Sequence, residues 1–316
     1  MAPVVWLAQP ACMISFRQKR AIANSDLFES GEMTANKIEV FAEGLDHSEC
    51  VVVHPDGSVW CGGEIGQIYR IDPSGKKIEE VANTGGFVLG LAFSPLADWL
   101  AICDIRKQSV LRLDLSNMKI ETLVDQVGDY RLKIPNYPAF TREGTLYFSD
   151  SGDFGTVTGQ IFRVEKSGKK ALWAGGSLNF ANGLALAPDE SYLYVVESFL
   201  PGISRFRIQA DGSAGPRELF VKELREVPDG LAFDTQGNLY CSCYAPSRIY
   251  KIDREGRVSI QAEDITSHAL ANCTNIAFGG PDFQSLLVAN LGRWHLSKIQ
   301  MDVRGAPLAC HASLSS

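Results

Sequence analysis

Short apolar runs separated by polar turns recur along most of the chain, at a spacing of about 45 residues. In one copy the runs are Gly230 to Phe233, Asn238 to Ser242 and Arg248 to Ile252. Runs of this length, rich in β-branched and aromatic residues and bounded by turn residues, are typical of β-strands. A fourth strand is expected in four of the copies, over residues 78–81, 120–124, 171–174 and 258–262.

Two repeated sequences define the period. Asn182-Gly183-Leu184-Ala185-Leu186 resembles Asp229-Gly230-Leu231-Ala232-Phe233 at an offset of 47 residues, and a Ser-Gly-Lys-Lys turn beginning at Ser74 returns at Ser167, 93 residues later. Four short strands in a repeat of this length indicate one blade of a β-propeller. Six copies predict an all-β, six-bladed β-propeller over residues 41–303, with an N-terminal arm at 1–40 and a C-terminal tail at 304–316.

Each copy carries one residue three positions before a small-then-apolar pair. These six positions, which we call the ring residues, are Glu49, Leu89, Asn136, Asn182, Asp229 and Thr274. The innermost strands of a propeller surround its central channel, so equivalent positions should form a ring at one mouth of the channel. Carboxylate and amide oxygens such as those of Glu49, Asn182 and Asp229 are hard ligands that suit Ca²⁺, Mg²⁺ or Mn²⁺. Asn-Gly and Asp-Gly are also common turn dipeptides, and one alone before a strand is more often a turn, but repetition at equivalent blade positions favours a site.

Composition narrows the possible partners. The chain of 316 residues has 30 Lys and Arg against 37 Asp and Glu, a net charge of −7, which argues against a nucleic-acid partner and suits a cation site. It has no apolar run of 18 residues or more, so no membrane partner is expected. The mildly apolar start precedes its basic cluster instead of following one, unlike a secretory signal, and a cytoplasmic protein is expected. The eight cysteines form no CxxC pair and are expected to be buried reduced thiols.

Several stretches together resemble the SMP-30/gluconolactonase/luciferin-regenerating-enzyme family of six-bladed propellers. In chain order they include Ser48-Glu49, Pro135-Asn136, Ala181-Asn182-Gly183 and Val227-Pro228-Asp229-Gly230, within about residues 40–303. The resemblance implies that Glu49, Asn182 and Asp229 hold one divalent metal ion, with Ca²⁺ favoured over Mg²⁺, Mn²⁺ or Zn²⁺. It also implies that Asn136 lies beside the metal and contacts substrate or metal, and it loosely matches Arg131 to a substrate-contacting arginine.

The sequence departs from the family pattern near the substrate. The usual Glu-Gly-Pro is Glu49-Cys50-Val51, and the usual Pro-Asn-Asp is Pro135-Asn136-Tyr137. Aromatic residues at the expected rim weakly favour a substrate that is not purely sugar-like. These residues are Phe87, Tyr137, Phe154, Phe199, Tyr244 and Trp294.

The resemblance implies a metal-dependent hydrolase that opens a lactone or a related small ester. Asp229 is the expected base or water-orienting residue, because hydrolysis needs a group that takes or directs a proton of water. Two alternatives stay open. Ala181 to Glu190 followed by Val196-Glu197-Ser198 also resembles strictosidine-synthase-like propellers. The fold is equally compatible with a non-catalytic propeller that binds a partner.

Overall fold

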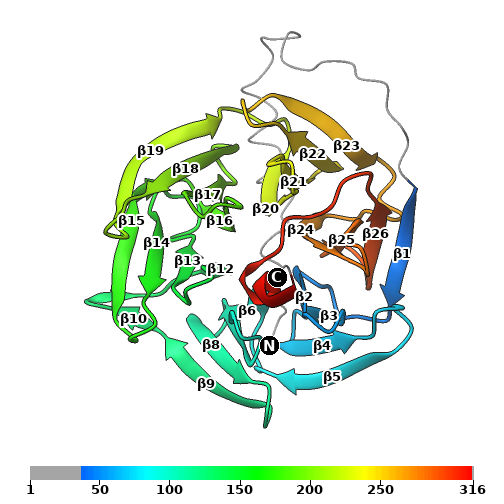
Figure 1. Cartoon of the computed structure of the whole chain (residues 1–316), viewed down its shortest axis with the longest axis horizontal. Helices are drawn as coiled ribbons and strands as arrows, with labels where there is room; N and C mark the ends of the chain where they lie inside the picture. The colour runs from blue at the N-terminus through cyan, green and yellow to red at the C-terminus, as the bar shows by residue number, and fades with distance from the viewer. Residues whose placement is uncertain (1–36, 315–316) are drawn as a thin grey trace.

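Six four-stranded antiparallel sheets are arranged around a central channel in the computed structural model, which describes residues 37–314 (Figure 1). The predicted six-bladed β-propeller is therefore confirmed. The predicted arm at 1–40 lies outside the described residues up to residue 36. Among the described residues, no helical segment has the length and apolar character of a membrane span.

The strands of each blade follow one another from the channel outwards. Blade 1 contains β2 (Cys50–Val53), β3 (Val59–Gly62), β4 (Gln67–Ile71) and β5 (Ile78–Asn83). Blade 2 contains β6 (Val88–Phe93), β7 (Trp99–Asp104), β8 (Ser109–Asp114) and β9 (Lys119–Val124). Blade 3 contains β12 (Pro135–Phe140), β13 (Leu146–Asp150), β14 (Gly159–Val164) and β15 (Lys170–Leu178).

The second half of the ring repeats this order. Blade 4 contains β16 (Ala181–Leu186), β17 (Tyr192–Glu197), β18 (Gly202–Ile208) and β19 (Ala214–Val221). Blade 5 contains β20 (Val227–Phe233), β21 (Leu239–Tyr244), β22 (Ser247–Ile252) and β23 (Val258–Asp264). Blade 6 contains β24 (Cys273–Gly279), β25 (Ser285–Asn290), β26 (His295–Gln300) and β1 (Ile38–Glu43). A hairpin of β10 (Gln126–Val127) and β11 (Tyr130–Arg131) interrupts the connection between blades 2 and 3.

The first described strand closes the propeller. β1 pairs antiparallel with β26, from Ile38 opposite Ile299 to Glu43 opposite His295, so one sheet contains both ends of the repeat region. The predicted boundary between arm and propeller falls within β1, because residues 38–40 pair in this sheet.

The positions of the strands follow from their hydrophobic pattern. The inner strand β2 is buried along its whole length, whereas the outer strand β5 alternates between partly buried and exposed positions. An inner strand has protein on both faces and an outer strand has solvent on one, so these patterns place each strand radially. The four predicted outer strands are confirmed as β5, β9, β15 and β23.

The repeated Ser-Gly-Lys-Lys sequence forms the turn before an outer strand, as its composition predicts. In blade 1, the Asp72 carboxylate accepts the backbone N–H groups of Lys76 and Lys77, both at 2.8 Å. Gly75 adopts a φ of 77°, a left-handed conformation that favours glycine. An Asx-type turn of this kind needs no phosphate or other ligand to hold its shape.

A polar side chain at the end of the second strand holds the loop that leads into the inner strand of the same blade. Asp104 accepts the N–H of Phe87 at 3.1 Å. In blade 4, Glu197 accepts the N–H of Asn179 at 2.8 Å. Because each loop leads into an inner strand whose second residue is a ring position, Leu89 or Asn182, these buried acceptors fix where each inner strand begins.

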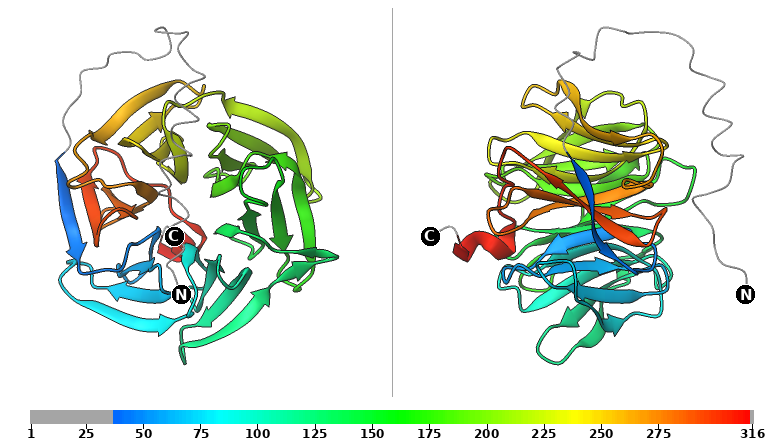
Figure 2. Two further views of the ribbon diagram at one scale, coloured as in Figure 1. Left: turned by 180° about the vertical axis from the view of Figure 1, so that it is seen from behind. Right: turned by 90° about the vertical axis from the view of Figure 1, so that its right-hand side faces the viewer.

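The C-terminal segment covers the end of the channel at which the inner strands finish. The N–H of Gly305 donates to Phe283 O at 2.8 Å and that of Ala306 donates to Phe233 O at 2.9 Å, and a 3₁₀ helix, η2 (Ala309–Leu314), follows. Figure 2 shows this helix on one face of the disc. Its Cys310 packs in the same apolar cluster as Val52 and Phe93. The predicted tail is thus part of the packed structure up to this helix.

Candidate functional site

The six ring residues lie where the inner strands begin, at the same end of the channel. Between 1% and 8% of their surface is exposed. Glu49 directly precedes β2, and the other five lie within the first three positions of their inner strands. The inner strands surround the centre of the disc in Figure 1. Repeat spacing in the sequence therefore corresponds to a shared level in the channel.

The Asn-Gly and Asp-Gly dipeptides at this level are not turns, which corrects one of the two explanations that the sequence allowed. Gly183 and Gly230 lie inside β16 and β20. A methyl group added to Gly183 would lie 2.2 Å from Asp229 O, and one added to Gly230 would lie 2.7 Å from Thr274 O. Glycine is therefore required because neighbouring inner strands approach each other at the ring.

A chain of hydrogen bonds orients the two asparagines. Asn136 Nδ2 donates to Ser151 Oγ at 3.1 Å, and Ser151 Oγ donates to Ala181 O at 2.7 Å. In the next blade, Asn182 Nδ2 donates to Ser198 Oγ at 3.1 Å. Both amide nitrogens are thereby engaged, so each Oδ1 is the atom left to bind a cation or a substrate hydroxyl.

The chain continues towards Asp229 and Glu49. Ser198 Oγ donates to the carbonyl of Pro228 at 2.8 Å, next to Asp229. Across the junction of blades 6 and 1, Thr274 Oγ1 donates to Glu49 O at 2.8 Å. The hydroxyl of one blade therefore positions the ring residue of the next.

The two ring carboxylates repel each other. Burial raises the pKa of Glu49 from its ordinary 4.5 to about 8. Burial also raises the pKa of Asp229 well above its usual range, and the neighbouring Glu49 raises it further, whereas the side chain of Asn182 acts in the opposite direction. Glu49, Asn182 and Asp229 therefore form one electrostatic unit in which negative charge is costly.

One atom of this unit has no partner. Glu49 Oε2 is buried and forms no hydrogen bond. An unpartnered carboxylate oxygen away from water is strongly unfavourable unless it is protonated or neutralised by a cation. Two carboxylates and an amide oxygen are hard donors of the kind that Ca²⁺ binds, so these residues fit a divalent cation.

Histidine, cysteine and carboxylate side chains alone do not make a metal site. In the part of the chain that the structure describes, no three of them are grouped so as to hold an ion. A metal at the ring would therefore depend on the amide oxygen of Asn182 as well as on Glu49 and Asp229.

Further acidic groups lie beside Glu49. Glu64 contributes to raising the pKa of Glu49. His47 Nδ1 lies 3.4 Å from Glu64 Oε2 and 3.5 Å from Asp46 Oδ1, and its ring lies 5.3 Å from that of Trp294. The acidic groups make this mouth negative, which favours the entry of a cation.

Tyr137 spans the channel below the ring. It belongs to β12 of blade 3, and its hydroxyl lies 3.5 Å from Asn275 Oδ1 in β24 of blade 6, on the opposite side. Asn275 Oδ1 also accepts the N–H of Val51 at 3.2 Å, which leaves the buried Nδ2 of Asn275 without a partner. This Tyr137–Asn275 contact separates the polar ring from the remainder of the channel.

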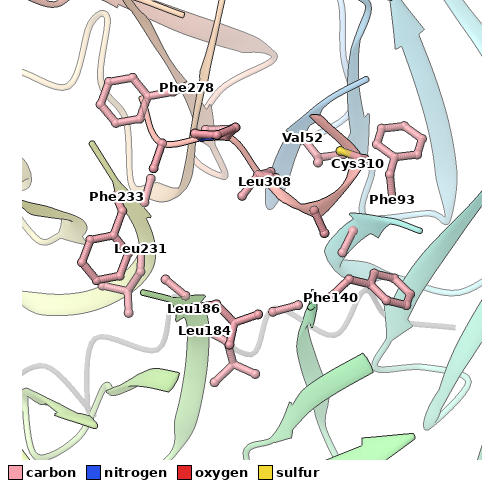
Figure 3. Close-up of a pocket in the computed structure, with 18 of the residues that line it drawn as sticks. Val52, Phe93, Phe140, Leu184, Leu186, Leu231, Phe233, Phe278, Leu308 and Cys310 are labelled. Carbon is pink, nitrogen blue, oxygen red and sulfur yellow. The ribbon is translucent and has the colours of Figure 1, made fainter. Parts of the chain in front are cut away.

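The remaining space below Tyr137 is an apolar chamber of about 100 Å³ (Figure 3). Its wall comes from the distal halves of the inner strands, and residues 306–310 form its floor. Labelled side chains around it include Phe93, Phe140, Leu186 and Phe233. The chamber touches none of the ring residues, so the cavity and the candidate metal site are separate features of one channel.

Arg131 is not grouped with the ring. It is exposed on β11, where it pairs with Gln126, whereas the ring residues are buried. Leu89 supplies an apolar side chain in the ring, so the polar groups come from the other five blades.

The serines that orient the asparagines were not predicted from the sequence. Ser151 follows Asp150 and Ser198 follows Glu197, each at the end of the second strand of its blade. An acidic residue followed by serine at equivalent repeat positions was the available signal. Asn275 had no comparable signal, because its role depends on a contact between opposite blades.

The fold and the ring define a six-bladed propeller with an oxygen-rich channel mouth. The family model described as "SMP-30/Gluconolactonase/LRE-like region" matches residues 47–291, and the chain belongs to this family.

Among relatives, the chain is 27% identical over 213 residues to Protein strictosidine synthase-like 6 of Arabidopsis thaliana, covering 62% of this chain and 56% of that protein. It is 29% identical over 195 residues to a gluconolactonase of Zymomonas mobilis, covering 55% and 53%. The chain thus spans about half the length of these curated relatives. A solved calcium-binding protein, regucalcin from Agrobacterium tumefaciens, superposes with a TM-score of 0.72 at 18% identity, over 87% of this chain and 98% of that one, which shows the shared fold.

Proposed function

We propose that this protein is a divalent-metal-dependent hydrolase that opens a small lactone. The observation that carries the proposal is the unpartnered, buried Glu49 Oε2 beside a second buried carboxylate, Asp229. A propeller that served only as a scaffold would have no need of this uncompensated site. The family membership and the named gluconolactonase relative support lactone chemistry.

Glu49, Asn182 and Asp229 would hold the ion. Bound there, a divalent metal supplies a Lewis acid for the lactone carbonyl and lowers the pKa of a coordinated water. Ca²⁺ is the favoured ion because the donors are oxygens, and the structural neighbour named as calcium-binding agrees with this choice. Mg²⁺, Mn²⁺ and Zn²⁺ remain the alternatives to be compared.

The protein side chains would divide the remaining work. Asp229 orients the attacking water or accepts its proton as the water oxygen bonds to the carbonyl carbon. The C–O bond within the cyclic ester of the lactone then breaks, and the released alkoxide takes up a proton to give the hydroxy acid. Asn136, held by Ser151, would contact a substrate oxygen, and Arg131 on its exposed hairpin would be an outer substrate contact.

The test is hydrolysis of a panel of lactones by metal-stripped protein before and after metal is restored. Gluconolactone, γ-butyrolactone and dihydrocoumarin would be assayed with Ca²⁺, Mg²⁺, Mn²⁺ and Zn²⁺. We expect turnover only with metal, and loss of turnover in a folded Asp229→Ala variant. Full turnover in that variant, or in metal-free protein, would contradict the proposal.

A second candidate rests on the similarity to strictosidine-synthase-like 6. A strictosidine-synthase-like, carbon–nitrogen bond-forming enzyme would need an amine substrate and no metal for turnover. The carboxylates Glu49 and Asp229 favour the lactonase over this alternative. Folded protein that binds no metal and opens no lactone would favour the second candidate or a partner-binding propeller.

A further inference from the structure

The apolar chamber follows a sequence pattern that the ring does not explain. Three residues after each ring residue, the chain places a side chain in the chamber wall. These six residues are Val52, Ala92, Ala139, Ala185, Ala232 and Ala277. Five of them are alanine, which makes this second level of the channel wide where larger side chains would fill it.

The chamber is shaped by large side chains around the small ones. Each of the five alanines is followed by Phe or Leu at the distal end of its strand, including Phe93, Phe140 and Phe233. Empty apolar space destabilises a fold in proportion to its volume. Here the space results from alanine at the same position of five blades, and not from one poorly packed side chain.

Both ends of the chamber are defined. Towards the ring, Tyr137 crosses the channel to Asn275 at 3.5 Å. On the other face, residues 306–310 form the floor, and Leu308 there is 49% exposed. Leu308 thus borders both the chamber and solvent, so at this face only the C-terminal segment separates the chamber from solvent.

The polar groups around the chamber are already engaged. Arg142 lines it, but its Nε lies 3.6 Å from Glu190 Oε1 and its guanidinium also donates to Pro188 O. A charged ligand would therefore have to disrupt this ion pair. The lining favours a neutral occupant, because hydrophobic burial is the available source of affinity.

We propose that the apolar chamber is a second binding site, independent of the ring, for a small neutral apolar molecule of about the size of a benzene ring. The volume of about 100 Å³ makes benzene the upper limit of size. An apolar protein cavity of about 150 Å³ takes up benzene, and this chamber is smaller. The site is entered from the face that carries the C-terminal segment, so its ligand does not pass the metal site.

The test uses full-length protein with benzene as the probe. We expect saturable shifts of the methyl NMR signals of Leu184, Leu231 and Leu308, and a rise in the unfolding temperature. Ala232→Leu should abolish both responses, while metal affinity measured by calorimetry stays unchanged. Ala139→Leu is the second filling variant, in case the first fails to fold. Ala171→Leu on the outer strand β15 is the matched control and should bind benzene like the unmodified chain.

Three outcomes would overturn the proposal. One is the absence of saturable shifts up to the solubility limit of benzene, and another is an unchanged response in both folded filling variants. The third is benzoate binding as tightly as benzene, which would show that the site is not selective for neutral molecules. Because the benzene and benzoate measurements need neither lactone nor metal, they are independent of the outcome of the hydrolase test.

Discussion

The amide nitrogen of Asn182 lies 3.1 Å from Ser198 Oγ, and this single contact decides which atom of Asn182 can serve as a ligand. The same serine hydroxyl donates to Pro228 O, so it connects Asn182 to the strand that carries Asp229. Two of the three candidate metal ligands are thus positioned by one buried side chain from blade 4.

Replacing this serine should weaken metal binding without removing a ligand. In Ser198→Ala the amide of Asn182 loses its fixed orientation, and we expect metal affinity to fall about 10- to 100-fold, as for other residues that orient metal ligands. Isothermal titration calorimetry with Ca²⁺ would measure the change. Ser191→Ala is the control in the same blade, because its hydroxyl bonds only to Asp189 in an exposed turn. Equal affinities in both variants would contradict the role of Ser198.

Neutralising Asp229 should have opposite effects on metal-free and metal-loaded protein. Asp229→Asn removes a buried carboxylate beside Glu49, so at high pH, where both carboxyls would be ionised and repel each other, the free energy of unfolding in chelator should rise. Stabilisation by added metal should disappear, whereas the unmodified chain should gain about 2.7 kcal/mol at 100 times its Kd. Urea unfolding with chelator and with Ca²⁺ measures both effects. Asp211→Asn, in an exposed turn, should leave the stabilisation by metal intact.

Metal affinity should increase with pH. The pKa of Glu49 is raised to about 8, so below that pH the free site holds a proton that a cation must displace. Each proton released makes the apparent affinity rise about tenfold per pH unit until the group is ionised. Calorimetry between pH 6 and 9 should show a rise across the whole range, because burial and Glu49 also raise the pKa of Asp229. A flat profile would mean that Glu49 is already ionised in the free protein.

The free energy of unfolding should fall in acid because of the buried His311 in the C-terminal segment. Burial lowers the pKa of His311 from 6.5 to about 4, and the ring of His311 packs edge-on against Phe283. The unfolded chain therefore takes up a proton at a higher pH than the folded one, so stability falls as pH drops from about 6.5 to about 4. A shift of this size corresponds to about 3 kcal/mol at most. Urea unfolding across this range should show a shallower decline in His311→Phe, and parallel curves would contradict the assignment.

The propeller was predictable because its evidence is local and repeated. Each blade carries the same alternation of apolar runs and turns, and equivalent positions such as Asn182 and Asp229 necessarily face one channel. Ala185 and Ala232, at the second level of the channel, belong to the same repeated segments as Asn182 and Asp229. From the sequence alone they indicated only that these segments are strands.

The missed features depend on contacts between distant parts of the chain. Ser198 matters through its bonds to Asn182 and Pro228, and Asn275 matters through Tyr137 on the opposite blade. No periodicity in one strand reveals such contacts. The turn interpretation of Gly183 was wrong for the same reason. Glycine is needed there because the backbone of the next blade lies close to it, and not because the chain turns at this position.

The pairing of β1 with β26 sets an order of events during synthesis. Glu43 is made some 250 residues before its partner His295 leaves the ribosome. The sixth blade therefore cannot close before β26 has emerged, and pairings so distant in sequence form slowly. Glu49 and Asp229 come together only in the closed disc, so a nascent chain carries the candidate ligands without the assembled site. Under the proposed function, a metal ion would therefore bind only after the disc has closed.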